Sequence, residues 1–125
     1  MSRAVLFTFV LFAAACSRSH RPAGESAGGG AAQAEAESIF KNRCTPCHGE
    51  KGGGDGPASA SLNPHPRNFH DKAWQAAVND EHIAKIIQFG GAAVGKSPNM
   101  PPNPDLQAKP EVVAELAKKI RTFGQ

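Results

Sequence analysis

Apolar residues recur at helical spacing from residue 35 onward, and four stretches of the chain carry the pattern. In the first stretch, residues 35–48, Phe40, Cys44 and Cys47 follow one another at positions i, i+4 and i+7. This is the spacing of one face of an α-helix. The apolar face of the predicted helix therefore leads directly to two cysteines near the helix end.

Three further helices are predicted, over residues 71–78, over 80–89 and from Pro110 to about residue 123. The second of these has Asp80 as its N-cap, Gly90 as its stop and three isoleucines on one face. The last begins with a proline and carries basic residues near its C-terminus, as helix-end preferences require. No stretch alternates between apolar and polar residues over a useful length, so we expect an all-α fold.

The N-terminal segment M-S-R-A-V-L-F-T-F-V-L-F-A-A-A-C combines one positive charge, a short apolar run and small residues before Cys16. The run is shorter than the roughly 20 residues that a membrane-spanning helix needs. We therefore predict an export signal peptide over residues 1–15. Small residues before a cysteine resemble the processing site of bacterial lipoproteins, so we expect Cys16 to carry a lipid. Cleavage by the ordinary signal peptidase near this point is the alternative.

Residues 16–34 separate this signal from the helical region. After Cys16 they contain four glycines, one proline and no large apolar side chain. Such a composition cannot bury enough surface to offset the entropy of ordering. We predict a lipidated cysteine and flexible linker over 16–34, followed by a single domain over 35–125.

Charge narrows the range of partners. The net charge of the 125-residue chain is +3, but from residue 35 onward eleven basic residues face ten acidic ones, which leaves a net charge of +1. Nucleic-acid binding requires a clustered basic face. We therefore expect no nucleic-acid partner.

The segment C-T-P-C-H, residues 44–48, is the strongest functional feature of the chain. C-x-x-C-H is the attachment signature of c-type haem. Thiols three residues apart near a helix end project to similar sides, so they can bond the two vinyl groups along one porphyrin edge. The predicted domain also has too few large side chains for a self-sufficient core, with one Trp, no Tyr and four Phe. A thioredoxin-like redox pair, a zinc site and a chance occurrence are the alternatives.

Four segments together resemble a class I cytochrome c, specifically the small bacterial monohaem type with a G-D-G-P loop after the haem motif. They are A-E-S-I-F-K-N-R-C-T-P-C-H-G-E-K-G-G-G-D-G-P, L-N-P-H-P-R-N-F, I-I-Q-F-G-G and N-M-P-P. The resemblance covers about residues 35–125. It implies an all-α, cytochrome c-like domain of about four helices around one covalently bound haem c.

The resemblance also implies roles for individual residues. Cys44 and Cys47 would form the thioether bonds to the haem, and His48 would be the proximal iron ligand. Pro57 matches the proline whose backbone carbonyl accepts a hydrogen bond from the other ring nitrogen of that histidine. Leu62 matches an apolar residue that packs on the haem.

Met100 is the leading candidate for the sixth iron ligand. It is the only methionine after the predicted signal peptide and lies 52 residues beyond His48, in a proline-rich loop. A methionine that only packs on the core is one alternative. Three histidines are rival ligands: His65, His70 and His82.

Iron held by histidine and methionine has no open position for a substrate, so the prediction is single-electron transfer between larger redox partners rather than enzymatic catalysis. No nucleophile with a base, no paired carboxylates and no phosphate-binding loop are found in the sequence. A haem enzyme or gas sensor with five-coordinate iron is the alternative, as is a fixed cytochrome subunit of a membrane oxidase or dehydrogenase. We expect the protein on the periplasmic side of a bacterial membrane, lipid-anchored or soluble.

Overall fold

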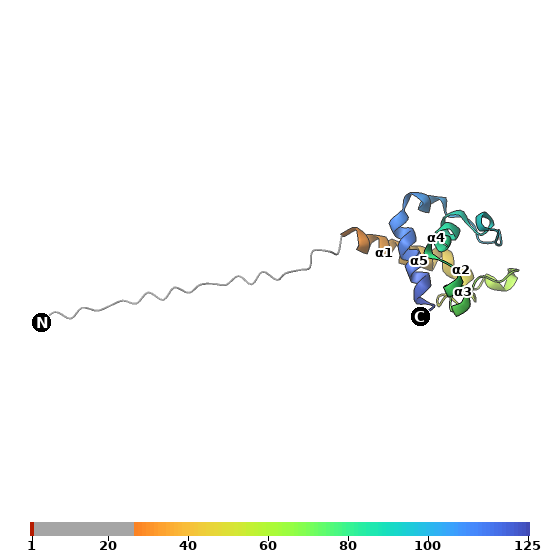
Figure 1. Cartoon of the computed structure of the whole chain (residues 1–125), viewed down its shortest axis with the longest axis horizontal. Helices are drawn as coiled ribbons and strands as arrows, with labels where there is room; N and C mark the ends of the chain where they lie inside the picture. Colours follow the sequence, from red (N-terminus) through yellow and green to blue (C-terminus); the bar gives the residue numbers. More distant parts are fainter. Residues whose placement is uncertain (2–26) are drawn as a thin grey trace.

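The computed structural model describes Met1 and residues 27–125, and within them the fold is entirely helical (Figure 1). The all-α prediction is therefore confirmed. The export signal, Cys16 and residues 17–26 of the predicted linker lie outside the described residues. The helices are α1 (Ala27–Ile39), a π-helical segment (Phe40–Cys44), α2 (Thr45–His48), α3 (Lys72–Ala77), α4 (Asp80–Phe89) and α5 (Pro110–Thr122), with short 3₁₀ turns at Ser59–Ser61, Ala92–Val94 and Pro104–Ala108.

The first helix begins at Ala27 and runs without a break through the π-helical segment to His48. The predicted start at residue 35 is therefore wrong, and so is the flexible linker for residues 27–34. The helix extends back to Ala27 because its small side chains pack closely in the core, where Ala32 and Ala36 are 8% and 2% exposed. Alanine is also the strongest helix former, which offsets the preceding glycines.

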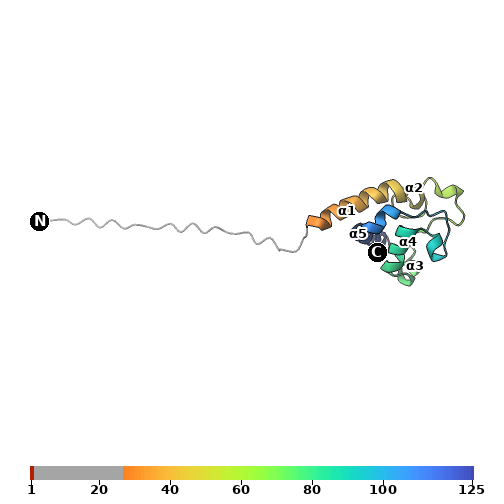
Figure 2. The same cartoon turned by 90° about the horizontal axis from the view of Figure 1, so that it is seen from above.

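The core lies where α5 crosses α1 and packs against α4 (Figures 1 and 2). Its two most deeply buried large side chains are Leu106, before α5, and Leu116, within α5. Ion pairs at the margin join the same elements, with Lys119 2.8 Å from Glu37 on α1. The remaining buried apolar residues are Ala32, Ala36, Ile39, Phe40, Phe69, Ile83, Ile87, Val112, Val113, Ala117 and Ile120.

The ends of α4 follow the sequence rules with one correction. Asn79, not Asp80, is the N-cap, because its side-chain oxygen accepts a hydrogen bond from the His82 N–H at 2.8 Å. Asp80 is instead the first helical residue, and its carboxylate lies 2.7 Å from Arg121 of α5. Gly90 ends the helix with φ of +77°, as predicted.

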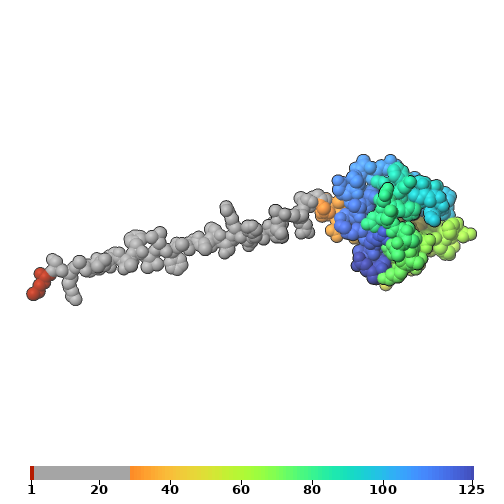
Figure 3. Space-filling model, in the orientation of Figure 1, coloured from red at the N-terminus to blue at the C-terminus, as the bar shows by residue number. Residues whose placement is uncertain are grey.

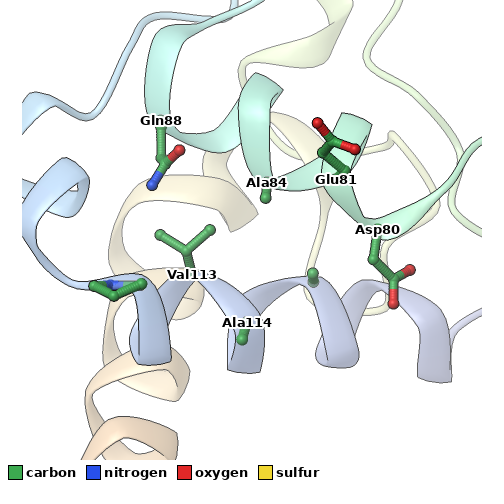
Figure 4. A pocket seen from close by; sticks show the side chains of 8 residues that line it. Asp80, Glu81, Ala84, Gln88, Val113 and Ala114 are labelled. Atoms are coloured by element: carbon green, nitrogen blue, oxygen red, sulfur yellow. The ribbon is translucent and has the colours of Figure 1, made fainter.

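A cavity of about 280 Å³ lies between α4 and α5, and Figure 4 shows side chains that line it. Its walls include Ala84, Val113 and Ala114, with Asp80 and Glu81 at one end. No residue of the C-T-P-C-H segment lines it. In the described part of the chain, none of the helices combines the length and apolar character that crossing a bilayer demands.

Candidate functional site

The two cysteines of the motif sit on either side of a helix junction. Cys44 ends the π-helical segment and Cys47 lies in α2, and both are free and half-buried. Cys44 packs against the hydrophobic core, and this burial raises the pKa of its thiol to about 11. Two unpaired thiols at C-x-x-C spacing on one helical stretch can form two bonds to a single group.

His48, the last residue of α2, has its Nδ1 atom 3.1 Å from the backbone carbonyl oxygen of Arg67. A carbonyl oxygen only accepts hydrogen bonds, so Nδ1 carries the proton and donates. The lone pair is then on Nε2, which is the form of imidazole that binds a metal. Burial lowers the pKa of His48 and favours this neutral ring, while the bond to Arg67 acts in the opposite direction.

The partner of His48 corrects the role expected of Pro57. Pro57 is exposed, and the carbonyl that contacts the histidine belongs to Arg67, ten residues further along the chain. The loop before Pro57 folds back on α2 instead. The Gly54 and Gly56 N–H groups donate to the carbonyls of His48 and Cys47, at 2.8 and 3.1 Å.

The glycines of this loop let other backbone segments approach it closely. A Cβ atom on Gly54 would lie 2.5 Å from the Pro66 carbonyl oxygen, and φ of +80° at Gly54 disfavours any other residue there. The Gly52 carbonyl accepts a hydrogen bond from the Phe69 N–H at 2.7 Å. The glycine loop, residues 52–56, therefore holds the segment 66–69 in place, and this segment in turn contacts His48.

Phe69 is a site residue that sequence reasoning missed. Its ring stacks on the His48 ring, with centroids 4.6 Å apart and planes inclined by 15°. It is 5% exposed and also packs against Trp74 and Phe123. The available signal was the phenylalanine that closes L-N-P-H-P-R-N-F, a segment that contributed to the family resemblance without a role for this residue.

Met100 is half-buried in the long connection between α4 and α5. Its carbonyl accepts a hydrogen bond from the Gly91 N–H at 3.0 Å, which ties the loop to the end of α4. Figures 1 and 2 place this connection and the loop after α2 at the same end of the domain, away from the start of α1. In Figure 3 the surface is hollowed between these cyan and yellow-green segments.

The other candidate residues lie in less informative positions. Leu62 is half-buried directly after the Ser59–Ser61 turn, and His65 is exposed. The Nε2 atom of His70 lies 2.7 Å from the Lys51 carbonyl oxygen. Nε2 must therefore donate, and it offers a metal no lone pair. Within residues 27–125, no three His, Cys, Asp or Glu side chains gather into a cluster suited to a metal ion.

Comparison with known protein families assigns the chain to one of them. The family model of cytochrome c matches residues 33–122, so the chain belongs to the cytochrome c family. Searches of curated proteins and of solved structures found no match. Membership implies a covalently bound haem c and a role in haem-based electron transfer.

The residues present fit that cofactor. The motif supplies two free thiols and, directly after the second, a histidine whose tautomer leaves Nε2 available. A c-type haem requires two thioether bonds and a proximal nitrogen ligand, and all three groups lie within five consecutive residues. The donor set at the end of α2 therefore matches the chemistry of the group that the family carries.

Proposed function

We propose that this protein is a class I cytochrome c of the small bacterial monohaem type, in which the G-D-G-P loop follows the haem motif. Cys44 and Cys47 hold the haem through thioether bonds, and His48 is the proximal iron ligand. The observation that carries the proposal is the hydrogen bond from His48 to the Arg67 carbonyl, because it fixes the metal-binding tautomer beside two free thiols.

We propose further that Met100 is the sixth ligand and that the protein carries single electrons without being an enzyme. The bound haem supplies a one-electron iron couple, and ligation of the iron by the methionine sulfur raises its reduction potential. The chain's own residues orient the ligands and exclude water, and Leu62 packs on the haem. With His48 and Met100 both bound, no coordination position is open to a substrate.

The proposed setting is the periplasmic side of a bacterial membrane, with donor and acceptor being larger redox proteins. Support comes from the apolar run before Cys16 and the small residues next to it. Lipid on Cys16 would hold the domain at the membrane surface. Labelled fatty acid should be incorporated into the wild type in its native host, and Cys16→Ser should abolish labelling and release the protein. An unlabelled, fully soluble wild type contradicts the anchor alone.

A redox titration of the purified holoprotein tests the function. The protein is produced in a host that attaches haem, and its absorption spectrum is followed as the applied potential changes. We expect haem that survives acid-acetone extraction and a single transition that fits a one-electron Nernst curve. A protein that loses its haem on extraction, or that shows no reversible one-electron transition, contradicts the proposal.

A further inference from the structure

Phe69 contacts the proposed proximal ligand through the face of its ring. The two ring centroids are 4.6 Å apart and the planes are inclined by only 15°, so the rings lie nearly parallel. The Arg67 carbonyl, two residues earlier on the same segment, engages the edge of the imidazole at Nδ1. One short segment therefore contacts His48 on both an edge and a face.

Phe69 is itself held firmly. Its N–H donates to the Gly52 carbonyl at 2.7 Å, and its carbonyl accepts from the Gln75 side-chain amide at 2.8 Å. On its other sides the ring meets Trp74 and Phe123, with centroids 5.7 and 6.1 Å away. A 5%-exposed ring with restraints on backbone and side chain is a rigid surface for the imidazole to rest on.

We propose that Phe69 is a positioning residue for His48, in that its ring fixes the plane of the imidazole while the Arg67 carbonyl fixes its edge. A single hydrogen bond at Nδ1 restrains one atom and still lets the ring swing about it. A parallel aromatic face removes that freedom. The inference rests on the proposed role of His48 as an iron ligand.

Orientation of the imidazole has two measurable consequences. The plane of the ring sets its overlap with the iron d orbitals, and so the magnetic anisotropy of the ferric haem. A well-aligned Nδ1–H···O=C bond makes the ring a better electron donor, which favours ferric iron. Loss of the Phe69 ring should therefore change the ferric electron paramagnetic resonance g-values and raise the reduction potential.

The test separates this role from simple filling of the core. Phe69→Leu keeps an apolar side chain but removes the flat face, whereas Phe69→Tyr keeps the face. Phe123→Leu is the matched control, because Phe123 belongs to the same aromatic cluster but packs against Phe40 and Phe69 rather than against His48. Each holoprotein is measured for covalent haem, ferric g-values, reduction potential and free energy of unfolding.

We expect Phe69→Leu to retain covalent haem, with shifted g-values and a higher potential, and Phe69→Tyr to restore both towards the wild type. Phe123→Leu should lower the free energy of unfolding and leave the g-values unchanged. Wild-type g-values and potential in Phe69→Leu overturn the inference, and so does an equal shift in Phe123→Leu.

A measurement on the wild type covers the case in which Phe69→Leu fails to fold. Proton NMR of the ferrous holoprotein should show nuclear Overhauser effects between the His48 and Phe69 rings, and their absence overturns the inference. Covalent haem is scored separately in every sample. A wild type without it overturns the proposed function, and the inference with it, whereas intact covalent haem with unchanged g-values in Phe69→Leu overturns the inference alone.

Discussion

His48 and Met100, the two proposed iron ligands, stand on segments that the fold secures in different ways. His48 ends a helix, stacks on the buried Phe69 ring and donates to the Arg67 carbonyl. Met100 lies in the segment 92–103, which has no buried side chain. The segment is held by backbone hydrogen bonds to the end of α4 and by Asn103, whose side-chain amide donates to the Ile87 carbonyl at 2.8 Å. His48 is therefore held by aromatic packing and a hydrogen bond to its ring, whereas the segment that carries Met100 is held by a few hydrogen bonds.

This difference indicates how each ligand should respond to perturbation. The contacts of His48 come from within about twenty residues along the chain and include buried aromatic packing. The Met100 loop depends on few contacts, and segments of this kind open at lower free energy than packed cores. We therefore expect Met100 ligation to be lost under conditions that leave His48 and the covalent haem in place.

The largest expected effect is on the histidine side. Replacing Cys44 and Cys47 together by alanine should abolish covalent haem, because no thiol remains at the motif to form a thioether bond. The measurement is haem retained on the polypeptide after acid-acetone extraction. Cys16→Ser is the matched control and should retain its haem. Covalent haem in the double variant contradicts the assignment of the motif.

Met100→Ala should change the iron site without unfolding the domain. We expect loss of the weak far-red band of iron–methionine ligation. The reduction potential should fall by a sizeable part of the roughly 0.8 V over which axial ligands set haem potentials. Spectroscopy and a redox titration measure both effects. If the far-red band persists in the variant, it does not come from Met100, and the assignment of Met100 as the sixth ligand is contradicted.

Gly91→Ala should weaken the far-red band even though Met100 itself is not replaced. A Cβ atom on Gly91 would lie 2.1 Å from the Ser97 carbonyl oxygen, so the loop must shift. Gly95→Ala is the matched control, because its Cβ would meet no atom within 4 Å even though φ is +70°. The control should lose only about 1–2 kcal/mol of stability through backbone strain. A far-red band weakened equally in both variants would falsify the steric explanation.

The smallest effect concerns the ion pair that joins the two sides. Arg43, in the π-helical segment, lies 2.9 Å from Asp105, beyond Met100, and its hydrogen bond lowers the pKa of Asp105 below the ordinary 3.8. A carboxylate with a lowered folded-state pKa stabilises the fold above its unfolded pKa, and this contribution is lost as pH falls through the folded value.

Asp105→Asn should therefore be slightly less stable than the wild type at neutral pH and equal to it well below pH 3.8. Urea unfolding across that range measures the difference. Glu115→Gln removes a carboxylate whose partner, Lys118, lies on the same helix, and it controls for the change in net charge. A difference between wild type and Asp105→Asn that is independent of pH contradicts the role of the pair.

The sequence is sufficient to predict the features that depend on residues close together along the chain. The C-T-P-C-H spacing indicates the haem site, and Gly90 and Pro110 place the ends of two helices, because each of these features depends on residues a few positions apart. The sequence does not predict the start of α1, because Ala32 and Ala36 are buried only in the folded protein, where α1 packs against α5. Small residues carry no amphipathic signal of their own.

The partner of His48 could not be obtained from residue types. Any residue can present a backbone carbonyl, so the resemblance favoured Pro57, whereas tertiary structure brings Arg67 to the ring. The same holds for Phe69, whose stacking depends on how the glycine loop seats the segment that carries it. Motif spacing predicts which atoms do the chemistry, and long-range packing decides which residues orient them.

Optical spectroscopy of the purified holoprotein, oxidised and reduced, with and without carbon monoxide, tests the central claim most directly. If His48 and Met100 both bind the iron, the oxidised protein shows the far-red methionine band, and the reduced protein binds carbon monoxide poorly at neutral pH. Ready binding of carbon monoxide together with absence of that band means that the iron has an open or weakly held position. That result contradicts the electron-carrier account and favours a haem enzyme or gas sensor.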